Sequence, residues 1–307
     1  MSPGGSAEMA RLRRAVAEIE AQAEGCQRAV RRVSLARALD PALGGGLADD
    51  ALHEIVPARP ADGAAAMGFA LALAARFLSR RPSAGLLIGE GFAEREAGAL
   101  YGPGLVAHGL CLSRLVFVHA PDADMGLWAM EEALKCGAPA AVVGEIWNLK
   151  GYSLAASRRL LLAARKGRTP ALLVLASAYG QADRLSSAAE TRFEIAAAPS
   201  ARIPAAAGRD LPGPFACGAR LVKARLGADS VDDRVGRAPI GHPEGRPSGL
   251  WGEDARLSAG CRARLHDPTR VVRLEWRSED RTFDDPAISL SLAAASGDGP
   301  RPAAASR

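Results

Sequence analysis

Residues 36–78 read ARALDPALGGGLADDALHEIVPARPADGAAAMGFALALAARFL, and this stretch decides the fold. Asp40 precedes a triple glycine at 44–46. The apolar run 51–56 follows, and after a loop comes the helix-like run 64–79. A strand, a loop and a helix in this order form the first half of a βαβ unit, so the stretch predicts the start of a parallel α/β core.

The same alternation continues to residue 200. Short runs rich in Leu, Val and Ala alternate with segments whose apolar residues are three or four positions apart, which is the helical period. The predicted strands are 51–56, 85–89, 114–119, 140–143, 171–176 and 192–197. The predicted helices are 64–79, 92–102, 124–136 and 153–166.

The pattern changes on both sides of this core. Gly, Pro and Arg are dense in residues 226–268, which predicts a flexible insert. The strand-like runs 219–224 and 271–276 flank the insert and are expected to add an antiparallel pair to the sheet. The predicted parts are an N-terminal amphipathic helix in 1–33, the core in 34–200, a C-terminal extension in 201–292 and a disordered tail in 293–307.

The composition is typical of a globular protein, with 48% apolar and 24% charged residues in a chain of 307. The longest apolar runs, 63–78 and 110–120, are shorter than the roughly 20 residues that a bilayer span needs, and arginines interrupt them. The N-terminus has no recognisable signal peptide. We therefore expect a cytoplasmic protein without membrane contact.

Metal and disulfide chemistry are not expected. The five cysteines are odd in number and form no Cys-x-x-Cys pair, which argues against a disulfide framework and a zinc site. The five histidines are scattered without the spacing of metal ligands.

Charge is divided unevenly along the chain. Residues 1–150 contain 15 Lys or Arg against 17 Asp or Glu, whereas residues 151–307 contain 24 against 17. The basic second half is compatible with contact to nucleic acid or to an acidic partner, and equally with a solvated arginine-rich surface.

The motif LDPALGGGL, residues 39–47, followed by LHEI, residues 52–55, resembles the start of the nucleotide-binding core of RecA-type ATPases. It resembles more closely the ImuA family, RecA-related accessory proteins of bacterial SOS mutagenesis. The resemblance covers residues 34–200. It implies a RecA-like P-loop NTPase core with a mainly parallel sheet.

The same resemblance implies a function and partners. The function would be that of a non-enzymatic adaptor in SOS-induced translesion DNA synthesis and mutagenesis. The implied partners are an ImuB-like Y-family polymerase homologue, RecA and, indirectly, an error-prone C-family DNA polymerase. Contact with DNA would be weak and secondary.

The nucleotide site is expected to be degenerate. A P-loop, Gly-x-x-x-x-Gly-Lys-Ser/Thr, binds phosphates through backbone N–H groups, the lysine and a Mg²⁺-binding hydroxyl. The corresponding residues 57–65 read PARPADGAA, with no Lys, Ser or Thr, and Asp62 would repel a phosphate. Neither a nucleotide nor catalysis is therefore expected.

The acidic positions of an ATPase site are not filled as expected either. The predicted strand 140–143 is followed by Gly144, where an aspartate would hold magnesium. Glu145 is expected to point to the other side of the strand. Glu90 follows the strand 85–89, where a RecA-type catalytic glutamate would stand, and both glutamates are interpreted as ordinary strand-end residues.

Partner binding is the remaining use of such a scaffold. Leu12, Val16 and Ile19 form an apolar stripe suited to docking, or alternatively to packing on the chain's own core. Trp276 and Phe283 lie in an arginine-rich setting suited to an interface anchor, or alternatively to a strand that closes the core. Two other functions stay open: an active RecA-type DNA-dependent ATPase and a SulA-like cell-division inhibitor.

Overall fold

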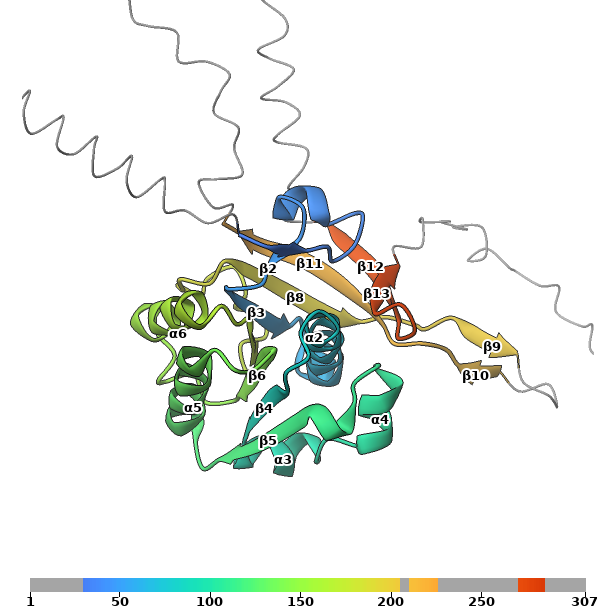
Figure 1. Cartoon of the computed structure of the whole chain (residues 1–307). Helices are drawn as coiled ribbons and strands as arrows, with labels where there is room; N and C mark the ends of the chain where they lie inside the picture. Colours follow the sequence, from blue (N-terminus) through green and yellow to red (C-terminus); the bar gives the residue numbers. More distant parts are fainter. Residues whose placement is uncertain (1–29, 205–209, 226–269, 285–307) are drawn as a thin grey trace, which may run out of the picture.

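The computed structural model describes residues 30–204, 210–225 and 270–284. It is a mixed α/β fold built on a nine-stranded, mainly parallel sheet (Figure 1). The predicted segment 226–268, the tail 293–307 and the stripe of Leu12, Val16 and Ile19 lie outside the described residues. The end of the predicted N-terminal helix is corrected: Arg32–Val33 forms strand β1, which pairs with β2, Leu47–Ala48.

The sheet joins a parallel part to an antiparallel part. In spatial order the strands are β13 (Thr282–Asp284), β12 (Val271–Arg277), β11 (Ala216–Ala224), β8 (Thr191–Ala197), β3 (Leu52–Pro57), β7 (Ala171–Leu175), β6 (Ala141–Ile146), β4 (Gly85–Glu90) and β5 (Leu115–Ala120). Strands β8 to β5 in this order are parallel, and β11, β12 and β13 are added antiparallel. The six predicted core strands and the predicted antiparallel pair are confirmed.

Helices cover both faces of the sheet. Helix α2 (Gly63–Leu78) packs on one face, and α5 (Ala123–Cys136) and α6 (Leu154–Gly167) pack on the other (Figure 1). These three helices confirm the predictions. The predicted helix 92–102 is wrong as one element, because Gly98, with a φ of 82°, ends α3 (Gly91–Ala97) before α4 (Gly102–Ala107) begins.

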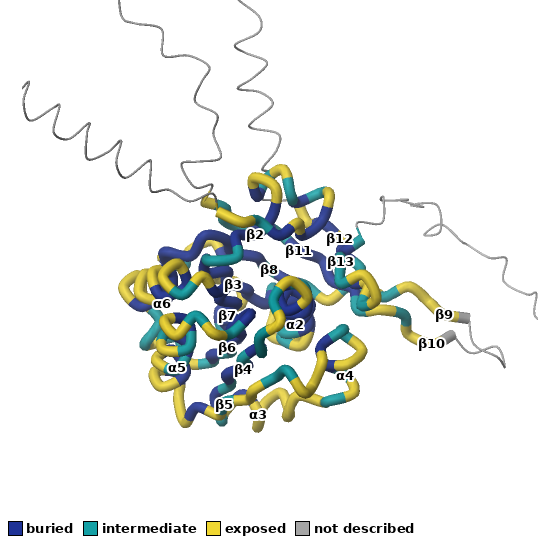
Figure 2. Tube along the Cα trace, in the orientation of Figure 1, coloured by how far each residue is buried: buried dark blue, intermediate teal, exposed yellow. Residues whose placement is uncertain are grey.

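Short elements complete the described chain. The 3₁₀ helices are η1 (Asp40–Leu43), η2 (Pro60–Asp62) and η3 (Leu112–Arg114). Strands β9 (Arg202–Pro204) and β10 (Asp210–Pro212) form a separate antiparallel pair that extends away from the sheet and is exposed in Figure 2.

The motif 39–47 has a structural explanation. The Asp40 carboxylate accepts hydrogen bonds from the backbone N–H of Leu35 at 2.6 Å and from the Ser34 hydroxyl at 2.6 Å, which closes the turn. All three glycines have positive φ, and a Cβ on Gly46 would overlap the Val33 carbonyl. The triple glycine therefore lets β1 and β2 approach closely.

The motif 52–55 places two polar side chains inside the sheet. His53 Nδ1 lies 2.8 Å from the Thr191 hydroxyl and Nε2 lies 2.8 Å from the Ala48 carbonyl oxygen, and burial lowers the pKa of this imidazole to about 4. Glu54 accepts a hydrogen bond from Arg192 Nε at 2.6 Å and another from the Tyr152 hydroxyl. Both residues thus connect β3 to neighbouring segments.

Arg192 also holds the connection from β7 to β8, residues 176–190. Its guanidinium donates to the carbonyls of Ala182 and Leu185 at 2.8 and 2.7 Å and to the Ser187 hydroxyl at 2.8 Å. The side chains of Arg192 and Glu54 are 2% and 0% exposed, so the pair is fully removed from water. Removing one partner of such a pair leaves an uncompensated buried charge.

The interpretation of Trp276 and Phe283 as exposed partner anchors is corrected. They are only 2% and 5% exposed and pack against each other with ring centroids 4.8 Å apart. Phe283 also stacks near Phe69 of α2, so both side chains belong to the core on the α2 face. The alternative, strands that close the core, is the one observed.

Within the described residues, one helical stretch, Pro60–Leu78, is long and apolar enough to cross a membrane by length and composition alone. Because 72% of it is buried inside the protein, its position is that of the core helix of a globular domain.

Arg192→Met removes the cation that neutralises buried Glu54. We expect the free energy of unfolding, measured by urea titration, to fall by about 3–5 kcal/mol. The same change at exposed Arg184 is the control and should shift it by less than about 0.5 kcal/mol. A loss below about 1 kcal/mol at position 192 would contradict the central role of the pair.

Candidate functional site

The connection between β3 and α2 is where a P-loop would bind phosphates. It comprises residues 58–62, and α2 begins at Gly63. In a P-loop the glycine at this point is followed by Lys and Ser or Thr, whereas Ala64 and Ala65 follow here. The helix therefore starts in the right place but has no side chain that could contact a phosphate or Mg²⁺.

Two backbone N–H groups of this connection donate within the protein, and a third is replaced by a proline. The N–H of Ala58 donates to the Ile195 carbonyl at 2.8 Å, and the N–H of Asp62 donates to the Arg59 carbonyl at 2.9 Å. Pro60 has no N–H. A phosphate cradle needs several free N–H groups that converge on one point, and this connection does not offer them.

The Asp62 carboxylate fills the connection from inside. Its side chain is 1% exposed and accepts hydrogen bonds from Arg59 Nε at 2.9 Å, Arg59 Nη2 at 3.1 Å and the Ala197 N–H at 3.0 Å. The Arg59 guanidinium, more than any other group, holds the pKa of Asp62 below its usual range. Because Arg59 and Asp62 neutralise each other, this ion pair leaves no uncompensated positive charge beside the position where a nucleotide would place its phosphates.

Packing explains why Gly144 replaces an acid. A Cβ on Gly144 would overlap the sulfur of Met130, which is fully buried on α5. The expected orientation of Glu145 is confirmed, because Gly144 faces α5 whereas Val143, two residues before Glu145 in the strand, belongs to the core on the α2 face. A magnesium-binding side chain at position 144 would need a different residue on α5.

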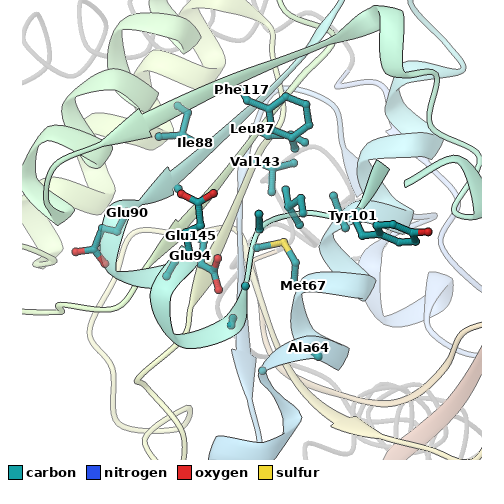
Figure 3. A pocket seen from close by; sticks show the side chains of 18 of the residues that line it. Ala64, Met67, Leu87, Ile88, Glu90, Glu94, Tyr101, Phe117, Val143 and Glu145 are labelled. Atoms are coloured by element: carbon teal, nitrogen blue, oxygen red, sulfur yellow. The ribbon is translucent and has the colours of Figure 1, made fainter. Parts of the chain in front are cut away.

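A cavity of about 710 Å³ lies between α2, the strands β4, β5 and β6, and the α3–α4 segment (Figure 3). Apolar side chains form most of its wall. Four glutamates also line it, and no lysine or arginine is among the described residues of its lining. The larger lining side chains are Met67, Leu71, Leu87, Ile88, Glu90, Glu94, Glu96, Tyr101, Leu105, His108, Phe117, Val118, His119, Val143, Glu145 and Trp147.

The carboxylates of Glu90, Glu94 and Glu145 gather at one end of the cavity, away from Tyr101 (Figure 3). The Glu90 carboxylate is already engaged, because Oε2 accepts from the backbone N–H of Trp147 and, at 3.4 Å, of Asn148. Glu94 lies 3.6 Å from His119 Nδ1. Glu90 therefore has the structural role expected of a strand-end residue.

Glu145 has the most unfavourable environment of the three. Burial, and then the negative charge of Glu90, raise its pKa to about 6. The buried Trp147 indole N–H is close enough to oppose this rise, yet it has no hydrogen-bond partner of normal geometry among the described residues. At neutral pH the cavity wall thus carries an ionised, half-buried carboxylate without a cation.

The sequence pattern identified only part of this site. It located the altered phosphate loop and both strand-end glutamates, but it did not identify the cavity, Glu94 or His119. Of the predicted partner-binding residues, Trp276 supports the cavity wall indirectly, because its indole N–H donates to the His108 carbonyl at 3.2 Å. Phe283 lies in the core, and Leu12, Val16 and Ile19 lie outside the described residues.

No protein-family model and no curated protein matches the chain. Among solved structures, the RadB recombinase aligns with a TM-score of 0.44 and 18% identity over 81% of this chain and 97% of its own. SulA from Pseudomonas aeruginosa aligns with a TM-score of 0.33 and 20% identity over 40% of this chain and 96% of its own. Both scores are below 0.5.

Glu145→Gln tests the raised pKa of the Glu145 carboxyl group. A folded-state pKa raised from 4.5 to about 6 gives stability that is present below pH 4.5 and lost as the pH rises through 6. We expect the substitution to raise the free energy of unfolding at pH 7.5 by about 1 kcal/mol more than at pH 5. Urea titrations at both pH values measure the difference.

Glu132→Gln, at an exposed position on α5, is the matched control. It should change the free energy of unfolding by less than about 0.5 kcal/mol at either pH. An equal loss of stability at both pH values for Glu145→Gln would contradict the raised pKa.

Proposed function

We propose that this chain is a RecA-like, ImuA-type adaptor without nucleotide chemistry, and that it acts in SOS-induced translesion DNA synthesis and mutagenesis. The β3–α2 connection carries the proposal, because it lacks the lysine and hydroxyl of a phosphate loop and the Asp62 carboxylate occupies its interior. Helix α2 begins where the helix after a phosphate loop would begin, but the lysine and the hydroxyl that would bind phosphate and Mg²⁺ are replaced by alanines.

Electrostatics supports the same conclusion. A bound nucleoside triphosphate brings several negative charges that need lysine, arginine or Mg²⁺. The cavity beside α2 instead presents Glu90, Glu94 and Glu145. Like charges repel, and no cation of the described lining offsets these carboxylates except a protonated His119, so this region disfavours a nucleotide.

The proposed partners are an ImuB-like Y-family polymerase homologue and RecA, with an error-prone C-family DNA polymerase recruited indirectly. Their support is the sequence resemblance of residues 39–55 to the ImuA family. The SulA-like alternative shares the lack of nucleotide chemistry and differs in its partner, a cell-division protein. The active ATPase alternative is disfavoured by Ala64 and Ala65, which stand where Lys and Ser or Thr are required.

Calorimetry tests the absence of nucleotide binding. Each charge-assisted contact that the lysine, the hydroxyl and the cradle would supply is worth about 1.5–3 kcal/mol, and these contacts are lost together. We expect no heat of binding when ATP and Mg²⁺ are titrated into the full chain, with an active RecA-type ATPase as positive control. Micromolar affinity would overturn the proposal.

The N-terminal stripe is tested in the full chain by changing Leu12, Val16 and Ile19 together to Asp. We expect at least a tenfold loss in capture of the ImuB-like polymerase homologue or RecA, because three unpaired carboxylates in an apolar contact would lose their water. The far-ultraviolet circular dichroism should stay unchanged. Loss of the fold itself would show that the stripe packs on its own core.

A further inference from the structure

The cavity under α3 and α4 has the properties of a binding site. Its volume of about 710 Å³ is within the range of ligand pockets, and its walls are mainly apolar. Tyr101 and Phe117 line it and are 72% and 43% exposed, so the cavity opens beside two accessible aromatic rings (Figure 3). Exposed aromatic residues next to a pocket are frequent anchors of protein interfaces.

The charge of the cavity is out of balance. Glu145 is half-buried, and the only ion pair that its acidic neighbours make within the described lining joins Glu94 to His119, a partner that is charged only when protonated. Elsewhere in the described part of the chain, inward-facing acids have arginine partners, as Glu54 has Arg192 and Asp62 has Arg59. A cation from a partner would supply the compensating positive charge that Arg192 and Arg59 supply to Glu54 and Asp62.

The shape of the site selects the kind of cation. The described residues contain no group of three or more His, Cys, Asp or Glu side chains close enough to hold a metal ion. Although three carboxylates lie at one end of the cavity, they therefore do not form the close group of ligands that a compact metal ion needs. A guanidinium is planar and weakly hydrated and presents five donors, so it can reach several separate acceptors. Its aliphatic stem would lie against the apolar walls.

We propose that this cavity receives an arginine side chain, with a neighbouring large apolar side chain, from a partner protein. The guanidinium lies between the carboxylates of Glu94 and Glu145, and the apolar side chain packs near Met67 and Phe117. The proposal rests on the adaptor function and adds to it the chemistry of the partner segment. That segment is basic and apolar rather than acidic.

Three probes test the proposal by calorimetry with the full chain. The first is a capped four-residue peptide with one arginine among leucines. The second has citrulline, a neutral isostere, in place of arginine. The third is butylguanidinium, the cation alone. We expect the arginine peptide to bind at least tenfold more tightly than either of the others.

Variants locate the binding. Glu94→Gln and Glu145→Gln should each weaken the arginine peptide about tenfold, because each removes one charge-assisted acceptor. Ala64→Trp, at an exposed position on the cavity wall, should block all binding without disturbing the core. Glu132→Gln, outside the cavity, is the control for loss of a negative charge and should leave the affinity unchanged. Circular dichroism verifies the fold of each variant.

Several results would overturn the proposal. These are equal affinity for the arginine and citrulline peptides, no weakening in Glu145→Gln, no binding of any peptide at millimolar concentration, or butylguanidinium as tight as the peptide, which would indicate a small-cation site. The adaptor function fails separately, through ATP binding or through no capture of its partners by the unmodified chain. Peptide binding without that capture would leave the cavity assignment standing alone.

Discussion

The ion pair between Glu54 and Arg192 is the interaction on which the rest of the fold depends. It joins β3 to β8 in the middle of the sheet, where neither charge reaches water. The attraction within such a pair offsets the free-energy cost of its desolvation only when its remaining hydrogen-bonding groups are satisfied. Here Tyr152 and the carbonyls of residues 182 and 185 satisfy them, so the pair also fixes the helix-free connection that crosses β3.

The two faces of the sheet differ in how completely helices cover them. The α5 and α6 face is closed, and Met130 fills the space beside Gly144. The α2 face is closed near β11 to β13, but it opens under α3 and α4 into the acidic cavity. The positions that would hold ATP in a P-loop protein are therefore connected to a space whose charge suits the opposite kind of ligand. The proposed absence of nucleotide chemistry and the proposed arginine site are physically compatible in one place.

Local patterns predicted most of the fold. The six core strands, β11, β12 and the helices α2, α5 and α6 follow from apolar periodicity, which acts over a few residues. The α3–α4 break depends on one glycine, Gly98, and was not predicted. Trp276 and Phe283 were misassigned because an apolar strand gives no sign of whether distant residues cover it, and Phe69 lies about 200 positions away in the sequence. The cavity depends on the packing of non-adjacent elements, so only the glutamate at each strand end was recognisable.

Burial of Trp276 and Phe283 also has a consequence for biosynthesis. A ribosome releases the chain from its N-terminus, and domains fold as their residues emerge. The parallel strands and α2 are complete long before β12 and β13 are made, so Phe69 and Phe193 face an unfinished core during that interval. The nascent protein must therefore pass through a stage with exposed aromatic surface, and the addition of β12 and β13 ends the period in which chaperones would protect that surface.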